Sequence, residues 1–143
     1  MSTGTMAVVR VSHRFSASAE RVFDAWLDPA KAGTWLFATP GGRMVRVEID
    51  GRVGGAFTFV DRRDGEDIEH VGEYLEIERP RRLVFTFAVP RFSPQRTRVT
   101  VEIAPRGSGC ELTLTHENVL PDWASRTESG WTMLLERLAA VLR

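Results

Sequence analysis

The sequence has a single cysteine, Cys110, so it can form no internal disulfide and no Cys-x-x-Cys zinc or redox pair. It also has no apolar run of about 18 residues, and its N-terminus lacks a basic segment followed by an apolar stretch. Neither a membrane-spanning helix nor a secretory signal is therefore expected. Together these absences predict a cytoplasmic protein with no membrane partner.

An excess of charge of either sign is also missing. The 19 basic and 19 acidic residues cancel to a formal net charge of zero. Without a basic field to attract phosphates, binding to nucleic acid would be costly, and we expect no nucleic-acid partner. The chain of 143 residues is 43% hydrophobic, which suffices for one core, and no repeat or change of composition divides it. We expect one domain over residues 1–143.

The strong catalytic motifs are absent: the sequence contains no GxSxG, HExxH or GxxxxGKS/T, and no GxGxxG that opens a helix. The three histidines, His13, His70 and His116, fall on three different predicted strands without the close spacing of a metal site. We expect no metal, no cofactor and a function other than catalysis. A cyclase- or hydrolase-like enzyme that uses Glu73 and a histidine as acid and base remains a weaker alternative.

The first part of the chain reads as a strand followed by two helices. Alternation of apolar and polar residues predicts a strand over 7–15. Ser18 is placed to cap a helix over 18–27. Asp28 followed by Pro29 is typical of a helix start and predicts a second helix over 29–36.

After Pro40-Gly41-Gly42, an alternation of period two predicts six further strands in an antiparallel meander with one polar and one apolar face. Asp50-Gly51 is expected to form a two-residue type I′ hairpin turn. The charged run 61–67 is expected to be a solvated loop. These strands supply most of the predicted sheet.

The C-terminus returns to a helical pattern. Ser125 and Glu128 have the spacing of a capping box, and an apolar stripe follows in a predicted helix over 125–142. The stripe consists of Trp131, Leu134, Leu135, Leu138 and Leu142. Because a one-sided sheet must bury its apolar face, this helix is expected to lie across it. The predicted class is α+β, in the order β-α-α-β-β-β-β-β-β-α.

Several ordered motifs resemble those of one family. The segment 15–29 (FSASAERVFDAWLDP) is similar to the opening signature of the activator-of-heat-shock-ATPase-like branch of the START/Bet v 1-like (SRPBCC) superfamily. The motifs that follow in order are 50–55 (DGRVGG), 72–77 (GEYLEI), 82–86 (RLVFT), 112–116 (LTLTH) and 130–131 (GW). The resemblance implies a helix-grip fold, in which a curved seven-stranded antiparallel sheet grips the C-terminal helix, often with a cavity between them. Such proteins include co-chaperone domains, ligand binders, proteins that sequester a toxic small molecule, cyclases and lipid carriers, so the fold alone leaves the function open.

Side chains on the concave face of the sheet are the candidate ligand contacts. Alternation along the fourth predicted strand places Val71 and Glu73 inward and Tyr74 outward. A bulge at Gly72 would exchange the two faces and turn His70 toward the cavity instead. The orientation of this strand therefore decides whether a carboxylate or a histidine faces a ligand.

The predicted ligand-binding residues combine a large aromatic lining with one carboxylate and one histidine. They are Trp35, Phe57, Phe59, Val71, Glu73, Phe85, Phe87, Val101, His116, Trp123, Trp131 and Leu135. Phe92 and Trp123 are expected at the cavity rim, and Gly130 within the helix indicates a close approach by a strand, a loop or a ligand. For most of the aromatic residues, however, we expect simple packing in the core.

We expect a non-catalytic protein that binds a hydrophobic, aromatic small molecule between the sheet and the last helix, oriented by Glu73 or His116. The alternative is a co-chaperone-like domain that stimulates a heat-shock ATPase through a protein surface. The predicted convex face mixes charges of both signs with threonines, for example at Arg98, Thr113 and Glu117. This pattern favours small-molecule binding over a docking patch of one sign. The sequence leaves a homodimer open.

Overall fold

The computed structural model describes residues 6–143, and its elements follow the predicted order. The strands are β1 (Ala7–Phe15), β2 (Arg43–Ile49), β3 (Ala56–Arg63), β4 (Glu66–Glu78), β5 (Arg82–Phe87), β6 (Thr97–Arg106) and β7 (Gly109–Val119). The helical segments are α1 (Ala19–Leu27), α2 (Pro29–Ala32), the short 3-10 turn η1 (Pro121–Trp123) and α3 (Ala124–Val141).

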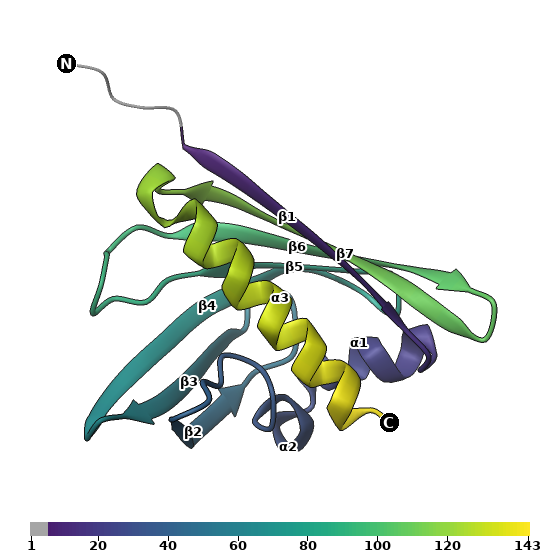
Figure 1. Cartoon of the computed structure of the whole chain (residues 1–143), viewed down its shortest axis with the longest axis horizontal. Helices are drawn as coiled ribbons and strands as arrows, with labels where there is room; N and C mark the ends of the chain where they lie inside the picture. Colours follow the sequence, from purple (N-terminus) through teal and green to yellow (C-terminus); the bar gives the residue numbers. More distant parts are fainter. Residues whose placement is uncertain (1–5) are drawn as a thin grey trace.

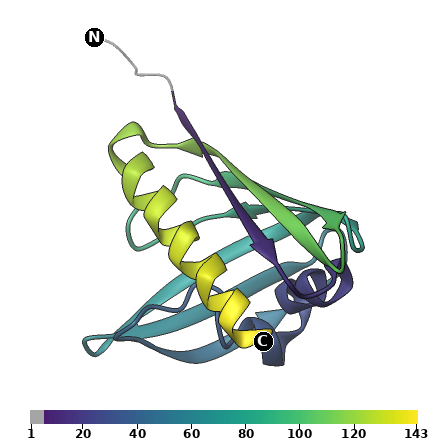
Figure 2. The same cartoon turned by 45° about the vertical axis from the view of Figure 1, so that its right-hand side comes forward.

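The seven strands form one antiparallel sheet in the order β1-β7-β6-β5-β4-β3-β2. Strands β2 to β7 pair with their neighbours in the sequence, and β1 completes the sheet beside β7. The sheet curves around α3, which crosses its concave side, while α1 and α2 close the end near the C-terminus of α3 (Figures 1 and 2). The predicted α+β helix-grip fold is confirmed.

The apolar stripe of α3 packs into the core as its spacing predicts. Its buried residues are Trp131, Leu134, Leu135 and Leu138. They belong to one hydrophobic cluster that also contains inward side chains of β6 and β7 and the buried face of α1. Burial of this stripe therefore fixes how α3 lies in the sheet.

Both predicted caps of the first helices form. The Ser18 hydroxyl accepts a hydrogen bond from the backbone N–H of Arg21, and the Asp28 carboxylate accepts one from the N–H of Ala30. The second helix is shorter than predicted, because it ends at Ala32 in a series of turns rather than continuing to residue 36. These turns lead to Phe37, whose φ of 60° lies in the left-handed region.

Two predictions about local structure are wrong. The connection between β2 and β3 is a six-residue loop, Asp50 to Gly55, rather than a type I′ turn. Backbone hydrogen bonds join Gly54 and Gly55 of this loop to Tyr74 of β4. A two-residue turn with positive φ at both positions lies instead between β3 and β4, at Asp64 and Gly65. The run 61–67 is consequently a strand hairpin rather than a solvated loop.

The Ser125 capping box is also absent. Helix α3 begins at Ala124, directly after η1, and its N-cap residue Trp123 makes no side-chain cap bond. Because η1 runs into the helix, Ser125 already lies within the first turn of α3. The predicted helix is therefore correct in extent to within one residue at each end, but its start is set by a 3-10 turn.

The predicted inward orientation of Val71 and Glu73 is wrong. The pairing of β4 with β5 shifts register between Tyr74 and Glu76, and this irregularity exchanges the two faces of β4. His70, Gly72 and Tyr74 are buried, whereas Glu73 is exposed. Gly72 is required here because a Cβ at this position would overlap the Thr86 carbonyl and the Phe57 ring. The sheet therefore turns a histidine, not a carboxylate, toward α3.

Candidate ligand-binding site

A cleft opens beside the N-terminal half of α3. Its larger hollow has a volume of about 250 Å³, and a smaller adjoining hollow of about 80 Å³ shares several of its walls. The shared residues are Phe87, Val89, Phe92, His116, Trp123 and Thr127. The larger hollow also reaches Phe37, Arg63, His70, Arg126, Gly130 and Trp131. We call the two hollows together the α3 cleft.

The opposite, deeper half of the grip is filled. The space lined by Trp26, Phe37, Phe57, Phe59 and Phe85 among others amounts to about 10 Å³, barely the room of one water molecule. The rings of Trp26 and Trp35 meet edge to face at 4.7 Å. Close packing of aromatic side chains leaves no room for a ligand there.

The predicted lining therefore divides between these two regions. Six of its members lie in the filled core: Trp35, Phe57, Phe59, Phe85, Val101 and Leu135. The structure brings together Phe87, His116, Trp123 and Trp131 at the α3 cleft. Val71 and Glu73 lie on the other face of β4, away from it. Phe92 and Trp123 lie at the rim as expected, with ring centroids 6.1 Å apart and Phe92 half exposed.

Phe37 forms the wall between the two regions, because it lines both the α3 cleft and the small residual space of the core. Its ring stacks on His70 at 5.0 Å and on Phe87 at 4.9 Å, and meets Phe59 edge to face at 5.2 Å. A left-handed φ costs a bulky residue on the order of 1–3 kcal/mol, so these contacts must hold it in place. No sequence signal marked Phe37 as a site residue.

His116 links α3 to three strands through a chain of hydrogen bonds. The Trp131 indole Nε1–H donates to His116 Nδ1 at 3.0 Å. The proton of His116 is therefore on Nε2, which donates to Thr97 Oγ1 at 2.7 Å, and the Thr97 hydroxyl donates to the Phe87 carbonyl at 2.8 Å. Burial lowers the pKa of His116 to about 4, so the ring is neutral near pH 7. Both of its nitrogens have protein partners.

His70 forms part of the floor of the α3 cleft. Burial, and secondarily the charge of Arg63, lowers the pKa of His70 to about 4. Its Nε2 lies 3.3 Å from Arg63 Nη2 and its Nδ1 lies 3.4 Å from the Phe59 carbonyl oxygen. Because arginine can only donate, Nε2 accepts and the proton of the neutral ring is on Nδ1.

Arg63 is held by a buried carboxylate that sequence reasoning missed. Asp61 is fully buried, and its Oδ2 accepts hydrogen bonds from Arg63 Nε at 2.7 Å and Thr39 Oγ1 at 2.9 Å. Gly42 makes room for this carboxylate, because a Cβ there would lie only 2.5 Å from Oδ1. The spacing of Asp61 and Arg63 was a usable signal, since residues two apart on a strand share a face.

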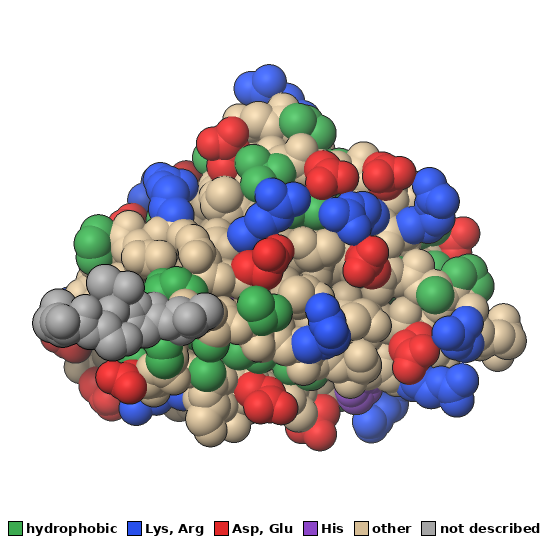
Figure 3. Space-filling model, turned by 90° about the horizontal axis from the view of Figure 1, so that it is seen from above, with side chains coloured by type: hydrophobic (Ala, Val, Ile, Leu, Met, Phe, Trp, Pro, Cys, Tyr) green, Lys and Arg blue, Asp and Glu red, His purple; other side chains and the backbone are tan. Residues whose placement is uncertain are grey.

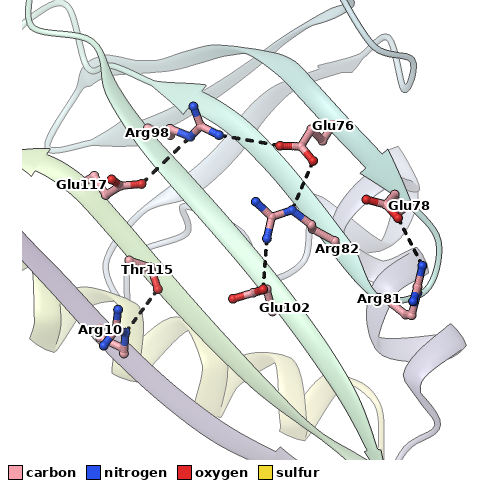
Figure 4. A network of polar contacts seen from close by, with 9 residues as sticks. All are labelled: Arg10, Glu76, Glu78, Arg81, Arg82, Arg98, Glu102, Thr115 and Glu117. Atoms are coloured by element: carbon pink, nitrogen blue, oxygen red, sulfur yellow. Dashed lines mark hydrogen bonds and ion pairs between the residues drawn. The ribbon is translucent and has the colours of Figure 1, made fainter.

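The convex face of the sheet has a different character. Arg82 bonds Glu76 at 3.2 Å and Glu102 at 3.0 Å, and Arg98 lies 3.7 Å from Glu76 and 4.0 Å from Glu117 (Figure 4). Seen from above the view of Figure 1, charges of both signs alternate over the visible surface (Figure 3). In this network the arginine and glutamate charges neutralise one another, so these residues form no patch of a single sign.

Within residues 6–143, the structure holds no group of three histidine, cysteine, aspartate or glutamate side chains that could bind a metal. The three histidines lie on three different strands, β1, β4 and β7. None of the helices described is long and apolar enough to cross a membrane.

A long C-terminal helix gripped by a curved antiparallel sheet, with a cleft beside the helix, defines the helix-grip class of START/Bet v 1-like proteins. The chain belongs to the family described as Activator of Hsp90 ATPase homolog 1-like protein, whose model matches residues 16–143. The resemblance noted in the sequence motifs is thereby confirmed. Among curated proteins, none matches the sequence.

Solved structures with the same fold come from several bacteria. Protein CV1439 from Chromobacterium violaceum is 29% identical, with a TM-score of 0.87 over 94% of this chain and 96% of that one. The Mll3558 protein from Rhizobium loti is 28% identical, with a TM-score of 0.79 over 96% of this chain and 98% of that one. The AHSA1-like protein from Aeromonas hydrophila, at 20% identity, shares the fold with a TM-score of 0.82 over 94% and 91%.

Proposed function

We propose that the protein is a non-catalytic binder of a hydrophobic, aromatic small molecule, which it holds in the α3 cleft. The observation that carries this proposal is the contrast between a filled core and an open cleft with aromatic walls. The larger hollow, of about 250 Å³, is open to solvent, so a two-ring molecule could lie in it with one side exposed. Apolar walls with a few polar groups are typical of small-molecule sites.

Gly130 supports this use of the cleft. The sequence predicted that a strand, a loop or a ligand lies close to Gly130. In the structure, a Cβ at this position would meet no atom within 4 Å. The strand and loop alternatives are therefore wrong. Glycine inside a helix costs about 1 kcal/mol relative to alanine, and at this position it leaves one wall of the cleft open. The missing side chain enlarges the space available to a ligand.

The test fills that space. Gly130→Leu should weaken binding of the uncharged fluorescent probe N-phenyl-1-naphthylamine at least about tenfold, because the leucine would occupy the cleft. It should not destabilise the fold, since leucine is a better helix former than glycine. Ser129→Leu, on the neighbouring exposed position of the same helix, is the matched control and should leave the affinity unchanged.

Two results would contradict the proposal. One is a wild-type protein that does not bind the probe at any concentration up to its solubility limit. The other is equal affinity in Gly130→Leu and wild type, which would place the probe elsewhere on the surface.

The family description makes stimulation of a heat-shock ATPase the alternative function. A stable docking surface buries about 800 Å² on each partner, and the self-compensated charges of the convex face offer no such patch. If Arg98→Ala weakened binding to a purified heat-shock ATPase, while no apolar probe bound the wild type, this alternative would replace the proposal.

A further inference from the structure

The charged side chains of the α3 cleft all have one sign. Arg63 and Arg126 line its larger hollow, and among the described residues no aspartate or glutamate lines either hollow. The chain as a whole has equal numbers of acidic and basic residues. His70 and His116 add no charge near pH 7, because burial lowers the pKa of each to about 4. The buried Asp61 compensates the charge of Arg63, so the uncompensated positive charge of the cleft is that of Arg126.

Arg63 is positioned in advance of any ligand. Its Nε is bonded to the fully buried Asp61, and its Nη2 lies beside His70. A guanidinium has five N–H donors in a planar fork, so donors remain on Nη1 and Nη2 after these two bonds. Because Asp61 already holds the side chain, little conformational entropy would be lost when Arg63 binds an anion.

Arg126 also lines the larger hollow of the α3 cleft. It lies in the first turns of α3, with its guanidinium carbon 5.9 Å from the centre of the Trp123 ring. Unlike Arg63, it forms no ion pair with any residue of the described part of the chain. The positive end of the α3 dipole lies at the same place and adds to its attraction for an anion.

We propose that the ligand of the α3 cleft is an aromatic anion, a molecule whose rings contact the aromatic walls and whose carboxylate or sulfonate is bound by Arg126 and Arg63. This inference rests on the proposed function, since it names the chemistry of the ligand at the same site. Charge-assisted bonds to a guanidinium orient the acidic group, while Trp123, Trp131 and Phe87 contact the rings. The arrangement selects against uncharged aromatic molecules of the same shape.

A matched pair of fluorescent probes tests the inference. N-phenyl-1-naphthylamine and 1-anilinonaphthalene-8-sulfonate share one ring framework and differ by the sulfonate. At low salt, the wild type should bind the sulfonate about tenfold more tightly than the uncharged probe. Arg126→Gln should remove most of this preference, because it should lower the affinity for the sulfonate far more than the affinity for the uncharged probe.

Two further variants complete the design. Replacing Arg63 alone would leave Asp61 buried without its cation, so Arg63→Gln is combined with Asp61→Asn. This double variant should also reduce the preference for the sulfonate. Arg14→Gln changes an exposed arginine at the far end of β1, opposite Glu111, and should alter neither affinity.

Each outcome decides between the two proposals. Equal affinity of the wild type for both probes would overturn the proposal that the ligand is an anion, and would leave the proposed aromatic-binding function intact. A preference for the sulfonate that survives in both arginine variants, or a parallel loss of both probes in Arg126→Gln, would also overturn it. Failure of both probes to bind the wild type would overturn the proposed function itself.

Discussion

The two halves of the grip share one helix and one sheet but differ in what lies between them. Toward the C-terminus of α3, the helices α1 and α2 close the sheet, and Trp26 and Trp35 fill the interior. Toward the N-terminus of α3, no second helix of residues 6–143 packs beside α3 as α1 and α2 do at the other end, and Trp123 and Trp131 border an open cleft (Figure 1). The fold encloses a space between helix and sheet, and the side chains that enter this space decide whether it becomes filled core or an open cleft.

The largest expected effect concerns the filled half. Leu135→Ala and Leu138→Ala each remove a fully buried side chain and should each lower the free energy of unfolding by about 2–5 kcal/mol. Val141→Ala, at an exposed position of the same helix, is the control and should cost less than about 0.5 kcal/mol. Urea denaturation measures all three. Losses below half a kilocalorie at both leucines would contradict the packing of α3.

The next-largest expected effect is a loss of folding stability at acidic pH, caused by the two buried histidines of the open half. Because the folded pKa of His70 and of His116 is about 4, below the ordinary value of 6.5, folding favours the neutral rings. The contribution of the neutral rings to the free energy of unfolding is fully present above pH 6.5 and is lost as the pH falls toward 4. The loss approaches roughly 3 kcal/mol for each histidine.

A non-titrating variant isolates this contribution from that of the carboxylates. Unfolding free energies of the wild type and of His116→Gln should be measured across pH 7 to 4 in steps of half a pH unit. The glutamine can still accept the Trp131 bond, and the variant should show a distinctly shallower decline. Parallel curves for the two proteins would show that His116 titrates normally, and would rule out its buried, neutral role.

A smaller effect is expected at the boundary between the two halves. Phe37→Leu should cost about 1–2 kcal/mol, since it removes stacking on His70 and Phe87 but keeps an apolar side chain. It should also extend the α3 cleft toward the core, so that bulkier aromatic probes bind more tightly than to the wild type. Phe92→Leu at the half-exposed rim is the control for stability. If probes of different size kept the same order of affinity in Phe37→Leu as in the wild type, Phe37 would not be the wall between the cleft and the core.

Much of the fold could be predicted from the sequence because the periods of two and 3.6 residues directly report which side chains are buried. Ser18 and Asp28 marked the helix starts correctly because a capping bond is local, spanning two or three residues. The order of strands followed from their succession in a meander.

The site was harder to predict because it depends on contacts between distant segments. The face of Glu73 was reversed by a register shift against β5, which alternation within β4 cannot reveal. Phe37 became a wall through a left-handed backbone conformation that its own sequence does not signal. Which aromatic residues fill the core and which line the cleft depends on how α1 and α2 cover only one end of the sheet.

The four tryptophans allow the most direct test of this division. Two of them, Trp26 and Trp35, lie in the filled half, and two, Trp123 and Trp131, border the cleft. Titration of ¹⁵N-labelled protein with N-phenyl-1-naphthylamine should shift the indole N–H signals of Trp123 and Trp131 and leave those of Trp26 and Trp35 in place. Shifts confined to Trp26 and Trp35 would contradict the account, because they would place the ligand in the half that the structure shows to be filled.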